Sequence, residues 1–341
     1  MPLISVVLPV YNVADYIRDA IYSILNQTIQ DFEIIVIDDY STDKTLSIIK
    51  SIKDNRIRII EKTVNKGLID SLNIGFKEAK GKFIARMDGD DKNVPTRFEE
   101  QLKVLQDNPA IKACGCWLQC FGASSKIIEH KEYHKEIQAQ LLLGNPMSLG
   151  ATMLKRGAYL NYSFDSYKIH AEDYDFWAKS AWECQMYNIQ EVLYHYRTHD
   201  DQVSSQYNNI QKTQDFDIKL NLFHKINYNK IEFSDAFLKK LLFSNSEISV
   251  VETNHFFKWL NQLMKINKKQ KVFGHIELIE VIVVLRRKLI YEIFFTNIRE
   301  GIDYTKRKEI LSSLPFKEKV FVIVKKLKER LYIIKNSYKN K

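Results

Sequence analysis

The sequence predicts an α/β fold in which a mostly parallel sheet is flanked by helices, followed by a helical C-terminal region. Short apolar runs rich in Val and Ile alternate with amphipathic stretches at the spacing of successive strand and helix units. Acidic residues follow several of these runs directly. The chain has 341 residues, 45% hydrophobic and 27% charged, which is enough for one large core and a smaller appended region.

Three strand and helix units and a fourth strand account for residues 4–87. The predicted strands are apolar runs too short for helices, at Ile4 to Val10, Phe32 to Ile37, Arg56 to Glu61 and Phe83 to Met87. Between them, apolar residues recur every three or four positions, which predicts helices after Asn12, after Ser41-Thr42-Asp43 and from Leu68 to Ala79. We expect Asn12 to cap the first of these helices.

Beyond Pro95 the predicted elements are less regular. Helices are expected around 98–105, 136–143 and from Tyr174, and strands at 111–121 and 151–154. The four cysteines lack the Cys-x-x-Cys spacing of a zinc site, so we expect buried thiols in a reducing cytoplasm; they are Cys114, Cys116, Cys120 and Cys184.

The end of the fourth strand, Asp88-Gly89-Asp90-Asp91, carries three carboxylates within four positions. Such a group repels itself unless a cation neutralises it. Asp88 and Asp90 point the same way on an extended backbone, and Gly89 leaves room for a ligand. Oxygen ligands of this kind favour Mg²⁺ or Mn²⁺. An acidic turn without a ligand is the alternative, and the rest of the chain must decide.

Three polar segments should meet at one edge of the sheet, because ligands of such sheets bind beyond the carboxyl ends of the strands. They are Pro9-Val10-Tyr11, Asp38-Asp39 and Asp88 to Asp91. No Gly-x-Gly-x-x-Gly and no Walker lysine motif follows the first strand, so dinucleotide and P-loop sites are not supported. Glu172 and Asp173 fall at a predicted helix start, where both a capping and a catalytic role are open.

Six segments, in this order, resemble the family 2 inverting glycosyltransferases, whose GT-A fold has a Rossmann-like sheet. The resemblance covers about the first 205 residues. The matching segments are Ser5 to Asn12, Val36 to Asp43, Asn65 to Leu68, Asp88 to Asp91 with Pro95 and Arg97, Ala171 to Trp177, and Tyr196 to His199.

The resemblance implies a nucleotide site and a metal site. Asp39 would accept a hydrogen bond from the imide N–H of the donor base, which favours uracil or thymine. The other nucleotide-binding residues would be Pro9, Tyr11, Asp38, Lys66 and Asp88. Mn²⁺ or Mg²⁺ would be held by Asp88, Asp90, Asp91 and His199, and would stabilise the charge on the departing diphosphate.

The resemblance also implies a catalytic pair. Asp173 would be the general base that takes the proton of the acceptor hydroxyl, and Glu172 would raise the pKa of that base or orient it. Two departures from the family pattern stand close to these sites. Ser148 to Thr152 lacks a His-Pro pair that relatives often carry, and Tyr40 occupies a position where Gly or Asn is common.

The C-terminal third shows helical patterns and no chemical motif. Residues 316–341 hold nine Lys or Arg against two Glu, so much of the net charge of +9 is local and does not indicate nucleic-acid binding. From Phe316 apolar residues recur every three or four positions. Two alternatives are open: a packed helix with a solvated basic face, or an interfacial helix on an anionic membrane. We see no signal peptide, and no apolar run approaches the ~20 residues needed to cross a bilayer.

Taken together, the sequence predicts a catalytic domain over 1–208 and a basic helical region over 209–341. The resemblance implies metal-dependent, inverting transfer of a hexosyl group from a nucleotide donor, expected to be a UDP-sugar. The expected acceptor is a saccharide or lipid-linked saccharide in capsule, O-antigen or lipooligosaccharide synthesis. The predicted location is cytoplasmic, with peripheral contact to the inner membrane face. The alternatives are a non-catalytic scaffold of the same fold and a sugar-1-phosphate nucleotidyltransferase.

Overall fold

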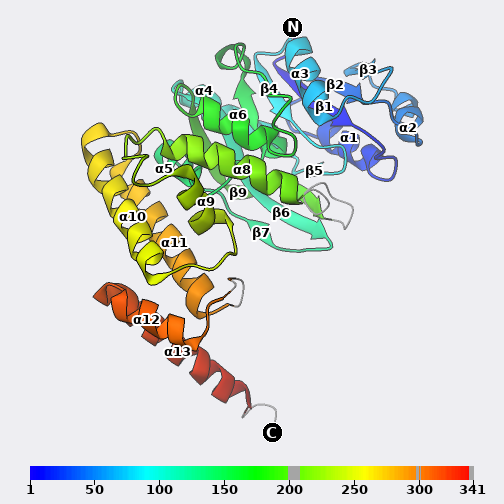
Figure 1. The fold of residues 1–341 in the computed structure, drawn as a ribbon. Coiled ribbons are helices and arrows are strands. Elements are labelled where there is room, and N and C mark those ends of the chain that lie inside the picture. The colour runs from blue at the N-terminus through cyan, green and yellow to red at the C-terminus, as the bar shows by residue number, and fades with distance from the viewer. Residues whose placement is uncertain (199–207, 297–298, 300, 338–341) are drawn as a thin grey trace. The chain divides into compact units, whose positions relative to one another are not determined.

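A computed structural model describes residues 1–198, 208–296, 299 and 301–337 (Figure 1). It confirms the predicted α/β class. The chain divides into two compact units, Met1–Leu222 and Phe223–Lys341. The division proposed from the sequence, 1–208 and 209–341, stays a prediction about where the catalytic part ends.

One sheet organises the first unit, with strands in the order β3, β2, β1, β4, β8, β6, β9, β5 and with β7 paired to β6. Strands β3, β2, β1 and β4 are mutually parallel, and so are β6 and β9. Strand β8 joins these two groups by antiparallel pairing to both β4 and β6. The strands are β1 (Ile4–Val10), β2 (Phe32–Asp38), β3 (Ile57–Glu61), β4 (Phe83–Arg86), β5 (Lys92–Asn93), β6 (Ile111–Gly122), β7 (Ile127–Ile128), β8 (Met153–Lys155) and β9 (Gln185–Thr198).

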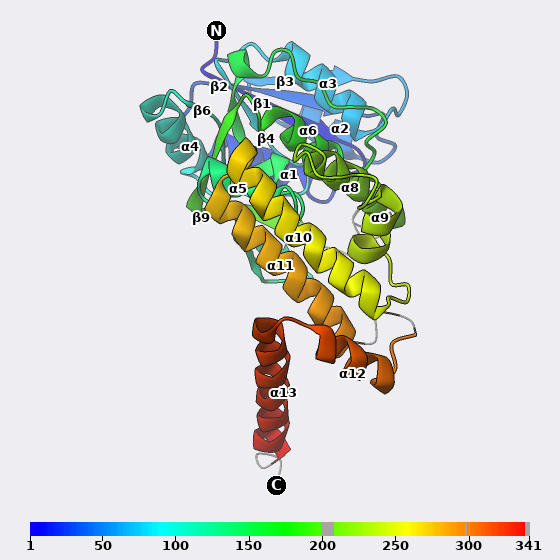
Figure 2. The ribbon, with the colours of Figure 1, turned by 60° about the vertical axis from the view of Figure 1, so that its left-hand side comes forward.

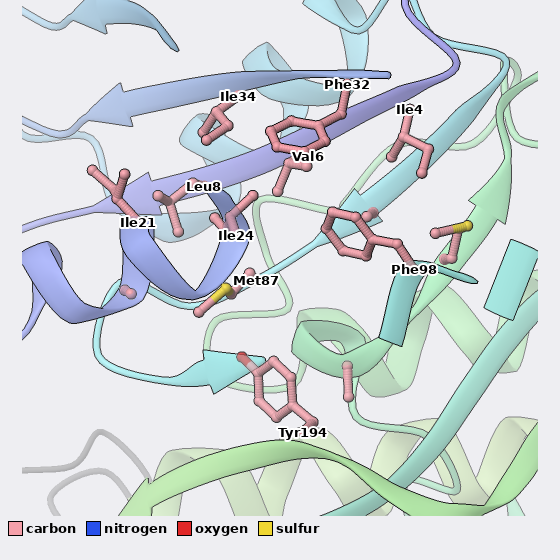
Figure 3. Close-up of a cluster of buried hydrophobic side chains, with 14 of the residues drawn as sticks. Ile4, Val6, Leu8, Ile21, Ile24, Phe32, Ile34, Met87, Phe98 and Tyr194 are labelled. Carbon is pink, nitrogen blue, oxygen red and sulfur yellow. The ribbon is translucent and has the colours of Figure 1, made fainter. Parts of the chain in front are cut away.

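Helices cover both faces of the parallel part, which explains the unbroken apolar runs in its strands. On one face, Val6 and Leu8 of β1 pack in a cluster with residues of α1 and α4, including Ile24 and Phe98 (Figure 3). On the other face α3 packs closely, since a Cβ at Gly75 would lie 2.4 Å from Cγ1 of Val7. The helices of this unit are α1 (Ile17–Leu25), α2 (Thr45–Ser51), α3 (Leu68–Glu78), α4 (Arg97–Asp107), α5 (His134–Gln140), α6 (Glu172–Ser180) and α8 (Asn208–Phe223).

Asn12 does not cap α1, so that prediction was wrong. The helix begins later, with Tyr16 at the N-cap position. Asn12 is left-handed, with φ 51°, a conformation that Asn tolerates better than most residues. Its Oδ1 accepts a hydrogen bond from the backbone N–H of Thr42 at 2.8 Å. Asn12 therefore ties the turn after β1 to the turn after β2.

The four cysteines are free and buried, as expected. Strand β9 was not predicted, although it is 14 residues long and pairs with β6 along most of its length.

The second unit is helical. Helices α10 and α11 lie side by side as a hairpin (Figure 2). A capping box between Ser249 and Glu252 opens α10. None of the helices in the described part of the chain is long and apolar enough to span a bilayer. The helices are α9 (Asp235–Phe243), α10 (Val250–Gln270), α11 (His275–Phe294), α12 (Tyr304–Ser313) and α13 (Phe316–Ser337).

Candidate active site

The carboxyl ends of β1, β2 and β4 meet at one edge of the sheet. Strand β1 lies between the other two, so the chain connections diverge at this point, where α/β sheets bind their ligands. Val10 is in register with Asp38, and Val7 with Arg86. The three polar segments predicted to converge are therefore neighbours.

Most of the hydrogen-bond acceptor sites of the Asp39 carboxylate are occupied by groups of the protein itself. Its Oδ1 accepts hydrogen bonds from the backbone N–H of Lys66 at 2.9 Å and lies 2.5 Å from Nζ of Lys62; its Oδ2 accepts from the N–H of Gly67 at 2.7 Å. A carboxylate has about four lone-pair sites, so one on Oδ2 is left for a ligand. Oδ1 of the buried Asp38, in contrast, has no hydrogen-bond partner among the described residues. The side chain of Lys66 is exposed, and only its backbone contacts Asp39.

Two exposed tyrosines follow Pro9 and Asp39. Tyr11 is 47% exposed and Tyr40 52% exposed. Tyr40 is left-handed, with φ 65°, which is the conformation that Gly or Asn adopts readily. Tyr40 adopts this conformation at a cost of roughly 1–2 kcal/mol relative to Gly.

Asp91 is turned into the protein. Its Oδ2 accepts a hydrogen bond from the hydroxyl of Tyr194 at 2.7 Å, and its Oδ1 accepts from the backbone N–H of Arg197, also at 2.7 Å. Burial, and next the charges of Asp88 and Asp90, raise the pKa of the Asp91 carboxyl. Asp91 thus fastens the turn after β4 to strand β9.

Asp88 and Asp90 are both partly exposed. Asp88 forms an ion pair with the buried Arg86, while Asp90 accepts a hydrogen bond through its backbone carbonyl from Nε of Arg197 at 2.8 Å. Gly150 closes over the cluster, because a Cβ there would lie 2.6 Å from Oδ2 of Asp88 and 2.8 Å from Nη1 of Arg86. Gly150 belongs to the segment in which the family's His-Pro pair is missing.

Glu172 and Asp173 form the first turn of α6. Oδ2 of Asp173 accepts a hydrogen bond from Nδ2 of Asn145 at 2.6 Å. Burial raises the pKa of Asp173 to about 6, against the opposing hydrogen bond from the Tyr174 N–H and the charge of Arg86. Burial, then the charge of Asp173, raises the pKa of Glu172 to about 7. Carboxyl groups with pKa values this close to neutral pH are better suited to proton transfer than to helix capping, which favours an ionised carboxylate.

Arg86 links the two groups of carboxylates. It pairs directly with Asp88, and its charge also lowers the pKa of Asp173 and of Glu172. Strand β4 and helix α6 thus place the acidic cluster and the α6 carboxylates in one electrostatic site.

The described residues contain no group of three or more His, Cys, Asp or Glu side chains placed to hold a metal ion. The partly exposed Asp88 and Asp90 nevertheless fit Mg²⁺ or Mn²⁺, which are bound through one or two carboxylates plus water and substrate phosphates. Asp91 fits less well, since both its oxygens are occupied. His199 lies outside the described residues.

Sequence reasoning missed three site residues: Arg86, Asn145 and Tyr194. Arg86 falls inside the apolar run predicted as the fourth strand, and Asn145 lies between two predicted elements, next to Pro146. The only signal for Arg86 was a charge inside an otherwise buried strand, which requires a partner.

Comparisons with known proteins show the family to which the chain belongs. The family model described as glycosyl transferase family 2 matches residues 5–176. An uncharacterized glycosyltransferase of Haemophilus influenzae is 32% identical over 307 residues, covering 80% of this chain and 95% of the relative. The chondroitin synthase of Pasteurella multocida is 28% identical over 241 residues, covering 69% of this chain and 25% of the synthase.

Among solved structures, residues 1–349 of TarS of S. aureus in complex with UDP-GlcNAc have a similar fold, with a TM-score of 0.56 at 15% identity, covering 84% of this chain and 90% of the TarS 1–349 chain. This similarity confirms the GT-A-type fold. The match of the family model over half the chain, together with the Haemophilus relative, leads to one conclusion: the chain belongs to glycosyl transferase family 2 and is a glycosyltransferase.

Proposed function

We propose that this glycosyltransferase moves a sugar, with inversion and with the help of a divalent metal, from a UDP-sugar to a saccharide acceptor in the synthesis of a surface polysaccharide. The observation that carries the proposal concerns Arg86, which pairs with Asp88 in the acidic cluster and whose charge also lowers the pKa of Asp173. The proposed donor site and the proposed general base are therefore neighbours. TarS, solved with UDP-GlcNAc, and chondroitin synthase support a nucleotide-sugar donor and a saccharide product.

The donor would lie at the ends of β1 and β2. Tyr11 and Tyr40 offer exposed rings on which the nucleotide base of the donor can stack. Asp38 Oδ1 and the remaining lone pair of Asp39 offer acceptors for the imide N–H of that nucleotide base. Asp88 and Asp90 would hold Mn²⁺ or Mg²⁺, which supplies charge stabilisation for the leaving diphosphate. We assign Asp91 a positioning role in place of ligation, because Tyr194 and Arg197 occupy its oxygens.

Asp173 would act as the general base. Asn145 donates to its Oδ2 and fixes the carboxylate, and Oδ1, which accepts from the adjacent Tyr174 N–H, has a second lone pair for the acceptor hydroxyl. Taking that proton as the acceptor oxygen attacks the anomeric carbon makes the oxygen a better nucleophile. Glu172, with its own pKa raised to about 7, would be partly protonated at neutral pH, which reduces the negative charge beside the general base.

The anomeric configuration of the product tests the proposal. The enzyme, UDP-α-glucose, UDP-α-N-acetylglucosamine and Mn²⁺ are mixed, and ¹H NMR follows slow transfer to water. Inversion predicts that the β-anomer of the free sugar appears first. Release of the α-anomer first would rule out the inverting mechanism, and turnover that is unchanged by EDTA would rule out the metal.

The predicted cytoplasmic location and contact of α13 with an anionic membrane also remain proposals. The face of α13 that carries the exposed residues Val320, Ile323 and Leu327 is flanked by lysines, as interfacial helices are.

A further inference from the structure

A cavity of about 580 Å³ lies in the first unit between β6, the segment after β7, α5 and β9. Its size is within the roughly 300–1,000 Å³ typical of small-molecule sites. None of the residues predicted from the sequence as site residues lines it. The lining includes Trp117, His130, Glu132, Tyr133, Asn145 and Gln190.

Asn145 connects the cavity wall to Asp173, the proposed general base. Asn145 belongs to the cavity wall, and its Nδ2 donates the 2.6 Å hydrogen bond to Oδ2 of Asp173. One hydrogen bond therefore joins the wall of the cavity to Asp173. This side of Asp173 is separate from the donor side, which is formed by the ends of β1, β2 and β4.

The lining combines aromatic rings with polar groups. Tyr133 is 59% exposed, and its ring is held edge-on against Tyr187 with centroids 5.9 Å apart. Trp117 is fixed by a hydrogen bond from its Nε1 to the carbonyl of His130 at 3.1 Å. Sugars present both apolar C–H faces and many hydroxyls, so rigid rings beside hydrogen-bonding groups suit them.

His130 belongs to the cavity wall, and its ring carries a buried nitrogen. Its Nε2 is buried and has no hydrogen-bond partner among the described residues. Burial lowers the pKa of His130 to about 4, so the ring is neutral at physiological pH. An unpaired buried nitrogen costs free energy unless a ligand or water satisfies it.

The charges of the lining select among sugars. Glu129, Glu132 and Glu136 contribute three carboxylates, and Lys131 contributes one positive charge. The hydroxyl of Tyr187 donates to Glu132, and Lys131 lies 3.9 Å from Glu136. The net charge of these four residues is −2, which disfavours an anionic sugar and tolerates a neutral or amino sugar.

We propose that this cavity binds the acceptor, and that the sugar it holds is neutral or carries an amino group instead of a carboxylate or phosphate. The proposal rests on the proposed function, because it takes Asp173 to be the base that receives the acceptor. Tyr133 and Trp117 then contact the sugar rings, and Asn145 leads the reacting hydroxyl to the base.

A glycan array tests this acceptor site. The labelled protein, with UDP and Mn²⁺, is applied to neutral, amino-bearing, uronate and phosphorylated glycans. We expect binding to one or more neutral or amino glycans and about tenfold weaker binding of the same glycans by Tyr133→Ala. Tyr22→Ala is the matched control, since Tyr22 is 45% exposed on α1 and does not line the cavity. A second variant, Glu129→Gln, should leave neutral glycans unaffected and raise binding of uronates.

Three results would overturn the acceptor site: binding to acidic glycans only, binding to no glycan, or equal loss in Tyr133→Ala and Tyr22→Ala. Calorimetric titration of the same proteins with UDP and Mn²⁺ separates this outcome from failure of the proposed function. If UDP binds and glycans do not, the acceptor site alone is wrong; if UDP does not bind the wild-type protein, the donor assignment is wrong.

Discussion

At the scale of single residues, the chemistry depends on how few charges the protein leaves unpaired. Arg86 is buried inside β4 and balances Asp88 while also acting on the α6 carboxylates. Asp91 and Asp39 have most of their acceptor capacity taken up by the protein itself. Asp88, Asp90 and Asp173 are partly exposed, and they are the carboxylates that we propose to meet the substrates and the metal.

The raised pKa of Asp173 predicts the acid limb of the pH profile. A general base must be unprotonated, so kcat/KM should be constant above pH ~7 and fall as the pH drops through about 6. Asp173→Asn should lower turnover by about 10²–10⁴-fold and leave UDP binding intact. Near-normal turnover in Asp173→Asn would show that another group is the base.

Gly150→Ala should damage the acidic cluster, because the new Cβ would lie 2.6 Å from Oδ2 of Asp88 and 3.0 Å from the hydroxyl of Tyr194. Overpacking of this kind costs about 1–3 kcal/mol, so the free energy of unfolding in urea should fall by that amount and Mn²⁺-dependent turnover should drop. Gly157→Ala is the control, since nothing lies within 4 Å of a Cβ there. Equal stability of the two variants would contradict the close packing.

Substitutions of Tyr40 test the left-handed backbone conformation at this position. At φ 65°, Gly suits the turn, whereas a β-branched residue is strained. Tyr40→Val should therefore lower the free energy of unfolding, because a β-branched residue tolerates this conformation less well than Tyr, and Tyr40→Gly should not lower it. Both variants lose the exposed ring, so weaker UDP binding in both, measured by titration, would support stacking of the base on Tyr40. Unchanged binding in both would remove Tyr40 from the donor site.

At the scale of elements, the periodic segments were predictable and the segments fixed by distant partners were not. Strand β1 was predicted at its observed bounds because its seven residues are all buried and all but Ser5 are apolar. Strand β9 mixes buried residues such as Tyr194 with partly exposed ones and contains register shifts against β6, so its sequence shows no clean period. The sequence identified the carboxylates of the proposed donor site. It could not show the hydrogen bond from Asn145 to Asp173, because Asn145 lies in a loop whose path depends on the tertiary fold.

Helix α13 has an exposed apolar face. Val322 is buried and Arg286 pairs with Glu318 at 3.2 Å, so part of α13 packs within the second unit. Ile323 and Leu327 are 51% and 53% exposed beside several lysines. This arrangement satisfies both alternatives considered for the segment, since one face packs and another is available to a membrane.

Substitution on the exposed face of α13 tests membrane contact without unfolding the helix. Ile323→Glu should reduce binding to phosphatidylglycerol vesicles in a co-sedimentation assay, by loss of apolar burial and by charge repulsion. The matched control is Val251→Glu, at a position 77% exposed on α10. Equal vesicle binding by both variants would contradict a membrane role for α13.

At the scale of the whole molecule, one unit carries every residue assigned a chemical role, and the other carries none. The first unit, Met1–Leu222, contains the edge proposed for the donor, the proposed general base Asp173 and the cavity proposed for the acceptor. Within it the parallel strands present the donor edge, whereas β6, β9 and α5 border the cavity. A transfer reaction needs both substrates at one centre, and Asp173 lies where these two parts meet.

The central claim is that the acidic cluster of this unit is a metal-dependent nucleotide site. Calorimetric titration of the wild-type protein and of Asp90→Asn with UDP, GDP, CMP and dTDP, each with and without Mn²⁺, tests it most directly. We expect UDP to bind the wild-type protein preferentially, with Mn²⁺ strengthening that binding, and Asp90→Asn to lose the strengthening by Mn²⁺. Absence of binding by all four nucleotides would contradict the claim and favour a scaffold that keeps the fold without catalysis.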